Sequence, residues 1–274
     1  MSTPRIQLPE PHSGFLARAL THLTKNSRIA GVAAGGSYLT HSIDEYSDLD
    51  LVIFIEPSAY ESVMSLRQTI AGELGPLLAA FTGEHVGEPR LLICLYGPPL
   101  LHVDLKFVSL EDAGERIEDP AVLFERDGRV TAAFAETAAR FPDLDLQWIE
   151  DRFWVWIHYA AAKIGRGELM EACDFLAFLR AQVLGPLALK QQGARPAGVR
   201  KIEFVAPQLT AEIQNTFTAY DSLSCLNALE FSVDLYRRLR IQSATKSFVS
   251  RKDAETAAVE YLHEIKSRVQ LPSA

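Results

Sequence analysis

Three aspartates stand in two segments that are otherwise mostly apolar. Asp48 and Asp50 alternate with leucines in one segment, and Asp104 lies between Val103 and Leu105 in a later one. Successive side chains of a β-strand point to opposite faces, so Asp48 and Asp50 are expected to project to one side while the leucines enter the core. If the strand of Asp104 pairs beside the first, the three carboxylates converge. Two carboxylates at ~4 Å repel by about 1 kcal/mol even in bulk water, so the cluster predicts a divalent cation, and hard oxygen ligands suit Mg²⁺.

A glycine-rich segment precedes these aspartates. Gly35, Gly36 and Ser37 follow an apolar stretch that predicts a strand, and ten residues separate Ser37 from Asp48. Glycines permit close approach of the backbone, and N–H groups at the start of a helix bind phosphate. The segment is therefore expected to open a helix and to bind the phosphates of a nucleotide, with the Ser37 hydroxyl as an additional donor. The Gly-Gly-Ser segment alone and the Asp-x-Asp pair alone are both common in turns and surface loops. Their combination with a third aspartate in a later strand indicates phosphoryl or nucleotidyl transfer.

The elements that must position these residues are predicted as an α/β half followed by a helical half. Apolar spacing predicts, in the first half, strands over 28–34, 48–56, 91–96 and 101–108, the last two as a hairpin, and helices over 15–25 and 59–80. Beyond residue 142 it predicts helices over 147–164, 168–190, 210–218, 222–243 and 252–268, with a loop at 191–207. The expected fold class is α+β, with a mixed β-sheet and flanking helices in residues 1–130 and a C-terminal helical bundle domain in residues 131–274.

The charge is unevenly distributed along the chain. Residues 1–140 carry 11 basic and 19 acidic residues, whereas residues 141–274 carry 16 of each, so the whole net charge of −8 lies in the first half. This balance suits a divalent-metal site and disfavours a long nucleic-acid ligand, which needs many phosphate-neutralising cations. The apolar stretches are shorter than the roughly 18 residues of a membrane helix, and the N-terminal segment lacks the apolar core of a secretory signal. A cytoplasmic protein without a membrane span is therefore expected.

The combined pattern resembles the nucleotidyltransferase superfamily typified by DNA polymerase β. That pattern is a strand followed by Gly-Ser, a short spacer, Asp-x-Asp and a third Asp on a later strand; Gly36 and Ser37, Asp48 and Asp50, and Asp104 match it within residues 25–110. The second half looks similar to the C-terminal domain of aminoglycoside and lincosamide nucleotidyltransferases. The resemblance implies that Asp48 and Asp50 hold the nucleotide-bound Mg²⁺, that Asp104 holds a second ion or acts as base on the acceptor hydroxyl, and that Gly36 and Ser37 grip the triphosphate.

Cations in both halves are further candidate nucleotide ligands. His102 and Lys106 share the predicted strand face of Asp104, so Lys106 could neutralise phosphate and His102 could order the metal shell or the acceptor; the alternative is that both simply line the edge of a cleft. In the helix over 147–164, Lys163 and Arg166 end a stripe of cations and aromatics at helical spacing. That stripe either brings Lys163 and Arg166 to the triphosphate or is a packing face between domains.

Together these features predict an enzyme that moves a nucleoside monophosphate, in the first instance AMP from ATP, to a hydroxyl of a small molecule and releases pyrophosphate. The acidic first half favours a cationic acceptor such as an aminoglycoside-like compound. The alternative is a non-catalytic nucleotide-binding or antitoxin-like regulatory member of the same fold, although a pure binder has no need of three mutually repelling carboxylates. The nucleobase, the acceptor and the oligomeric state, including a possible homodimer, are left open.

Overall fold

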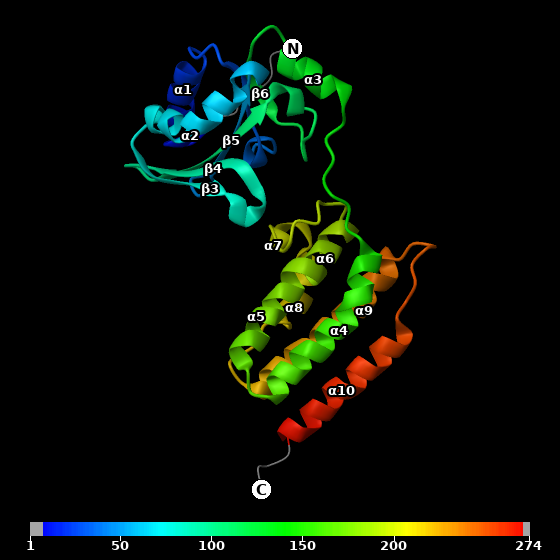
Figure 1. The fold of residues 1–274 in the computed structure, drawn as a ribbon. Helices are drawn as coiled ribbons and strands as arrows, with labels where there is room; N and C mark the ends of the chain where they lie inside the picture. Colours follow the sequence, from blue (N-terminus) through cyan, green and yellow to red (C-terminus); the bar gives the residue numbers. More distant parts are fainter. Residues whose placement is uncertain (1–7, 271–274) are drawn as a thin grey trace. The chain divides into compact units, whose positions relative to one another are not determined.

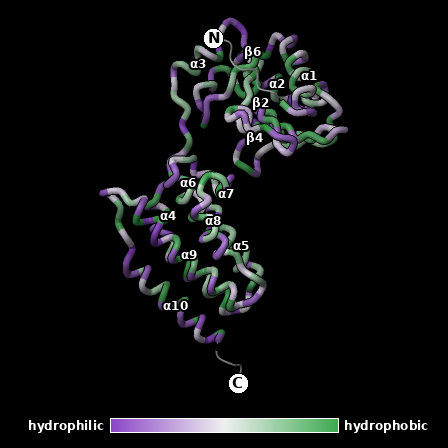
Figure 2. Tube along the Cα trace, turned by 180° about the vertical axis from the view of Figure 1, so that it is seen from behind, coloured by the Kyte–Doolittle hydropathy of each residue, from purple (hydrophilic) through white to green (hydrophobic). Residues whose placement is uncertain are grey.

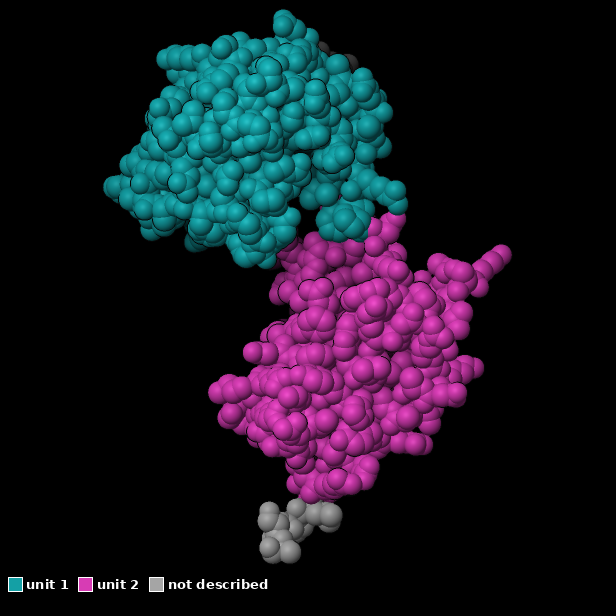
Figure 3. Space-filling view, viewed as in Figure 1, with its two compact units in different colours: residues 1–142 teal, residues 143–274 magenta. Residues whose placement is uncertain are grey.

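The computed structural model describes residues 8–270, which belong to two compact units, residues 1–142 and 143–274 (Figure 3). Most of the N-terminal segment that is predicted to lack a secretory signal lies outside the described residues. Unit 1 continues past the boundary expected after residue 130. The reason is that helix α3 (Arg129–Glu136) packs against strands β1 and β6 of the sheet and therefore belongs to the first core.

Unit 1 is built on a six-stranded mixed sheet (Figure 1). Its strands are β1 (Ile29–Ala34), β2 (Leu49–Ile55), β3 (Leu77–Gly83), β4 (Glu88–Tyr96), β5 (Leu101–Ser109) and β6 (Ala121–Glu125). They lie in the order β3-β4-β5-β2-β1-β6. Strands β2 and β5 are parallel, and the other neighbouring pairs are antiparallel, including the expected β4–β5 hairpin.

Helices cover the two faces of this sheet unequally. Helices α1 (His12–Leu23) and α2 (Tyr60–Leu74) lie on one face and bury the main apolar core of the unit between them and the strands. On the opposite face, α3 covers a smaller cluster that includes Phe54 of β2, Val108 of β5 and Val130 of α3 itself. The part of that second face formed by β3 and β4 is left outside this cluster.

Two parts of unit 1 differ from the sequence prediction. The helix predicted over 59–80 ends at Leu74, and Leu77–Gly83 forms the edge strand β3. Gly75 and Pro76 interrupt the helix, since proline lacks the amide hydrogen that a continuing helix needs, and a short apolar run such as 77–81 fits a strand as well as a helix. Strand β6 was not predicted, because its five residues carry no alternation of apolar and polar side chains.

Unit 2 is a bundle of helices, as predicted. Its helices are α4 (Leu146–Gly165), α5 (Leu169–Leu179), α6 (Gly185–Gln191), α7 (Ile202–Val205), α8 (Pro207–Gln214), α9 (Ser222–Ser243) and α10 (Lys252–Gln270). A π-helical turn, Arg180–Leu184, joins α5 to α6, and α7 lies inside the expected loop 191–207. The predicted fold class, a mixed sheet with flanking helices followed by a helical domain, is confirmed.

The helices of unit 2 differ in how much of each is buried. The segment Leu169–Gln191 is long and apolar enough to cross a membrane by length and composition, and 56% of its most apolar window is buried inside the protein, as in the core helices of soluble domains. Helix α10, by contrast, is hydrophilic along much of its length (Figure 2) and buries only Ala258, Leu262 and Ile265. Helix α10 therefore packs one apolar side against the core of unit 2 and exposes its remaining sides.

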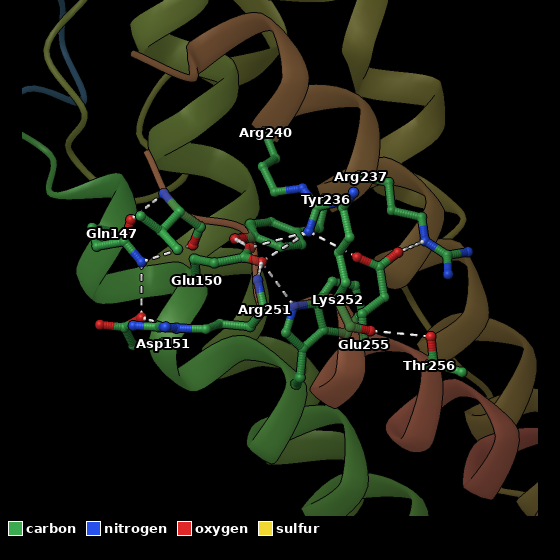
Figure 4. A network of polar contacts seen from close by, with 12 residues as sticks. Gln147, Glu150, Asp151, Tyr236, Arg237, Arg240, Arg251, Lys252, Glu255 and Thr256 are labelled. Atoms are coloured by element: carbon green, nitrogen blue, oxygen red, sulfur yellow. Dashed lines mark hydrogen bonds and ion pairs between the residues drawn. The ribbon is translucent and has the colours of Figure 1, made fainter. Parts of the chain in front are cut away.

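A buried ionic network joins α4, α9 and the start of α10 (Figure 4). Glu150 is fully buried, and its carboxylate accepts hydrogen bonds from the Tyr236 hydroxyl at 2.6 Å, from Trp154 Nε1 at 3.1 Å, from the Arg240 guanidinium at 3.0 Å and from the Arg251 amide at 2.9 Å. These contacts connect residues far apart in sequence, so this one carboxylate organises the middle of unit 2.

Candidate metal and phosphate site

The three aspartates meet at the parallel strands β2 and β5. Asp50 of β2 lies directly opposite Asp104 of β5 in the strand register, and Asp48 immediately precedes β2. One carboxylate oxygen from each residue lies within 4.8 Å of the corresponding oxygens of the other two. All three side chains are partly buried. The convergence expected from the sequence is therefore present in the structure.

Apolar residues on the other face of the two strands fix this arrangement. Leu49 and Leu51 of β2 pair with Val103 and Leu105 of β5, and all four are at most 1% exposed in the main core. A one-residue slip of either strand would exchange its two faces, so that aspartate would enter the core and leucine would leave it. Core packing thus determines which carboxylates meet.

The glycine-rich segment lies against Asp50. Gly36 has a positive φ of 58°, and a Cβ atom built on it would lie 2.0 Å from Asp50 Oδ2, so glycine is required for both conformation and space. The Gly35 amide donates to the Asp50 carbonyl at 3.0 Å. The segment does not open an α-helix as expected; it forms a short 3₁₀ turn, Gly36–Tyr38, and the chain then continues as a loop to Asp48.

The hydroxyl of Ser37 is a buried polar atom without a hydrogen-bond partner in the described part of the chain. Buried polar atoms are nearly always paired, so an unpaired one next to a glycine cradle indicates a place for a hydrogen-bonding ligand. We call Gly35–Ser37 the phosphate loop from here on. Its position beside the aspartates matches the expectation from the sequence.

An acidic residue that the sequence analysis did not single out already occupies this loop. The Gly36 amide donates to Glu118 Oε1 at 2.8 Å, so a carboxylate is bound by one of the N–H groups expected to bind phosphate. The loop amide is therefore oriented toward an anion. Because 82 positions separate the two residues and Glu118 lies in an irregular segment, no sequence pattern pointed to it.

A buried histidine holds the chain just before Asp48. His12 of α1 is 1% exposed, and its Nε2 lies 2.7 Å from the Ser47 carbonyl oxygen. A carbonyl only accepts, so Nε2 carries the hydrogen. The Ser47 hydroxyl in turn donates to Asp44 Oδ1 at 2.8 Å. These contacts hold Ser47, the residue immediately before Asp48, and no local sequence pattern indicates them.

The two predicted cationic neighbours of Asp104 have different surroundings. His102 Nε2 lies 3.0 Å from Asp104 Oδ1, so the imidazole contacts the carboxylate cluster. Lys106 Nζ instead forms an ion pair with Glu88 Oε2 at 2.7 Å. Arg90, followed by Lys106, lowers the pKa of Glu88 to about 2, so the Glu88 carboxylate stays charged at neutral pH. Binding of phosphate by Lys106 would require the lysine to exchange this partner.

Lys163 and Arg166 lie at the C-terminal end of α4 in unit 2. Lys163 Nζ pairs with Glu168 at 2.6 Å and with Glu171 at 2.9 Å, and the Arg166 guanidinium pairs with Glu168 at 2.8 Å. Both cations thus have acidic partners within their own unit. Their proposed contact with nucleotide stays a prediction.

The donor set of the site fits a magnesium-bound nucleotide. Three carboxylates supply the hard oxygen ligands that Mg²⁺ prefers, and Mg²⁺ commonly completes its octahedral shell with water and phosphate oxygens. The glycine cradle lies next to the carboxylate of Asp50, and the unpaired Ser37 hydroxyl follows it in the same loop. The arrangement can therefore hold a divalent cation on one side and phosphate on the other.

Substitution of Gly36 by alanine tests the contact between the phosphate loop and Asp50. The new methyl group must displace the Asp50 carboxylate, so we expect nucleotide affinity to fall by about tenfold or more, equivalent to roughly 1.4 kcal/mol. Gly87→Ala is the matched control, because Gly87 also has a positive φ, of 75°, but no atom within 4 Å of a built Cβ. Both variants should lose about 1 kcal/mol of stability to backbone strain. Calorimetric titration with a magnesium–nucleotide complex should separate them, and equal affinities would contradict the contact.

Comparison with known proteins found similarity only to solved structures. No family model matches the sequence, and no curated protein matches it. An aminoglycoside 6-adenyltransferase from Bacillus subtilis aligns at 15% identity over 91% of this chain and 96% of its own, with a TM-score of 0.39. A nucleotidyltransferase-like protein from Exiguobacterium sibiricum 255-15 aligns at 13% identity over 96% of this chain and 82% of its own, with a TM-score of 0.40. At such values, function has to be argued from the site itself.

Proposed function

We propose that this chain is a nucleotidyltransferase that moves a nucleoside monophosphate, AMP from ATP in the first instance, to a hydroxyl of a small molecule. The observation that carries the proposal is the convergence of Asp48, Asp50 and Asp104 beside a phosphate loop with an unpaired buried hydroxyl. Three partly buried carboxylates repel one another without a cation, and a structural role would not require such a cluster. Aminoglycoside-like compounds, favoured by the acidic charge of the first half, are the first acceptors to examine.

Each residue of the site has a role in this proposal. Asp48 and Asp50 hold the cation that accompanies the triphosphate, and Gly36 and Ser37 bind the phosphates through the backbone amide and the hydroxyl. When bound, Mg²⁺ would neutralise the carboxylates and stabilise charge on the phosphate oxygens. The acceptor oxygen forms a bond to the α-phosphorus while the bond from that phosphorus to the bridging oxygen breaks, and the electron pair of that bond leaves with pyrophosphate. Asp104 completes the carboxylate cluster that would hold the cation, and it takes the hydroxyl proton.

The direct test measures pyrophosphate release and product mass together. Purified protein is incubated with MgATP and a panel of hydroxyl compounds that includes aminoglycosides. The proposal predicts pyrophosphate release that depends on an acceptor, and a product heavier than that acceptor by one adenylyl group. Nucleotide binding without pyrophosphate release under any condition would support the non-catalytic alternative. Absence of both magnesium-dependent nucleotide binding and pyrophosphate release would overturn the proposal.

Removing the charge of Glu118 is expected to tighten nucleotide binding. A triphosphate that uses the Gly36 amide must displace the Glu118 carboxylate and overcome its repulsion. Glu118→Gln removes that repulsion, so the Kd for a non-hydrolysable MgATP analogue should fall by about threefold to tenfold, or roughly 0.7–1.4 kcal/mol. Glu115→Gln, an exposed change in the same segment, should leave the Kd unchanged. Weaker binding in Glu118→Gln would show instead that this carboxylate assists the nucleotide.

A further inference from the structure

The sheet face that carries the aspartates continues across β4 and β3 as an apolar surface. In the register of β4 with β5, Ile93 pairs with Asp104 and Leu95 pairs with His102. On β3, Phe81 pairs in turn with Ile93, and Ala79 pairs with Leu95. Directly paired residues of neighbouring strands share a face, so all of these side chains lie on the face of Asp104. We define the apolar shelf as the residues of β3 and β4 in these pairs, namely Ala79, Phe81, Ile93 and Leu95.

The apolar shelf is exposed, unlike the other end of the same face. Phe81 is 54% exposed and Leu95 is 39% exposed. Over β1, β2 and β6 this face is covered by α3, where Val130 packs into the smaller core cluster. No charged residue occurs within 79–81 or 93–95. An exposed apolar surface next to polar groups of a candidate site is a common feature of ligand-binding sites.

The order of the strands puts the phosphate loop and the apolar shelf on opposite sides of the aspartates. The loop follows β1 and contacts Asp50 of β2, and beyond β2 the strands continue as β5, β4 and β3. In a phosphoryl-type displacement the attacking and leaving oxygens lie roughly in line on opposite sides of the phosphorus. If pyrophosphate leaves toward the loop, the attacking hydroxyl must therefore approach the phosphorus from the opposite side, which is the side of β4.

We propose that the apolar shelf binds the acceptor, and that the acceptor is a hydroxyl compound with an apolar ring or alkyl face. This inference rests on the proposed nucleotidyl transfer and narrows its acceptor. An apolar group gains free energy when it leaves water for such a surface, whereas a polycationic amino sugar has little apolar surface to bury there. The acidic charge of unit 1 is spread over the whole domain, but the shelf adjoins Asp104 itself, so the shelf determines the class of acceptor.

The test measures acceptor binding to the full chain loaded with Mg²⁺ and a non-hydrolysable ATP analogue. The probes are a set of aryl and alkyl glycosides, the same sugars without the apolar group, and an aminoglycoside. We expect the apolar glycosides to shift the methyl NMR signals of Ile93 and Leu95 and to bind about tenfold more tightly than the plain sugars. Leu95→Ser and Phe81→Ser should each weaken that binding by about tenfold without changing nucleotide affinity.

Leu66→Ser is the matched control, because Leu66 is a 41% exposed leucine of α2, which covers the opposite face of the sheet. This substitution should change neither the affinity for the apolar glycosides nor the affinity for the nucleotide analogue. Apolar glycosides that do not bind, or that bind without shifting these methyl signals, would overturn the role of the shelf. An aminoglycoside that binds more tightly than the apolar glycosides, and whose affinity neither serine substitution lowers, would also overturn the role of the shelf. Failure of the parent chain to bind the nucleotide analogue would overturn the nucleotidyl-transfer proposal, and the role of the shelf with it.

Discussion

Replacement of Asp50 by asparagine is expected to lower kcat for nucleotidyl transfer by about 10³-fold, or roughly 4 kcal/mol of transition-state stabilisation. Asparagine keeps the shape of the side chain but removes the negative charge that binds a divalent cation. Asp50 lies opposite Asp104 and also against Gly36 of the phosphate loop, so in the proposed reaction its charge acts on both the cation and the triphosphate. The rate of pyrophosphate release at saturating MgATP and acceptor measures the effect.

Two controls separate a catalytic effect of Asp50→Asn from a structural one. Asp127→Asn makes the same chemical change at an exposed position of unit 1 and should leave kcat unchanged. In the absence of divalent cations, Asp50→Asn should not lower the Tm, since it relieves repulsion among three neighbouring carboxylates. Transfer at the parental rate by a folded Asp50→Asn protein would show that the cluster has no part in the chemistry.

The second large effect is expected on stability, at Glu150 in unit 2. Glu150→Ala leaves the buried donors of Tyr236 and Trp154 without their acceptor, and Arg240 keeps only Glu255 as a carboxylate partner. A buried donor left unpaired costs about 1–3 kcal/mol, so we expect a loss of about 3 kcal/mol or more from the two donors together. We expect the Tm of unit 2 to fall by about 10 °C, as measured by calorimetry. Glu264→Ala removes one partner of an exposed ion pair with Arg268 on α10 and should cost less than about 1 kcal/mol.

The pH dependence of this effect has a definite sign. Burial acts to raise the pKa of Glu150, but the hydrogen bonds from Tyr236, the Arg251 amide and Trp154, together with the charge of Arg240, outweigh it and lower the pKa below its ordinary value of 4.5. A depressed carboxyl pKa stabilises the folded state above the unfolded pKa and loses that effect as the pH falls. The stability difference between the parent and Glu150→Ala should therefore be full at neutral pH and shrink below about pH 4.5. A difference that grows in acid would contradict this assignment.

The sequence predicted the core strands and the aspartate cluster because a strong physical constraint fixed both. Alternation of Asp48 and Asp50 with buried leucines determines which face of the sheet they occupy. The buried neighbours of Asp104 in β5 place its side chain on that same face. Strand β3 is not predictable from its pattern, because its apolar run has no alternation and continues the apolar spacing of α2 beyond the break at Gly75 and Pro76. Short apolar segments need their tertiary neighbours before their conformation is determined.

The parts of the site that were missed all depend on long-range contacts. Glu118 reaches the Gly36 amide, and His12 reaches the Ser47 carbonyl, from segments whose local sequence shows no relation to the loop. The pairing of Lys106 with Glu88 has the same origin. A sequence pattern can indicate which residue types suit a chemistry, but the partner that each side chain selects depends on how the elements pack.

Binding of Mn²⁺, observed by electron paramagnetic resonance, tests the metal-binding role of the aspartate cluster most directly. Mn²⁺ suits the same oxygen ligands as Mg²⁺, and its spectrum changes when it binds protein. The parent chain and a variant with Asp48, Asp50 and Asp104 all replaced by asparagine are titrated in the presence of a non-hydrolysable ATP analogue. We predict a saturable protein-bound signal in the parent that is absent from the variant. Equal Mn²⁺ binding by both proteins, or no protein-bound signal in either, would contradict the claim that these carboxylates hold the metal–nucleotide complex.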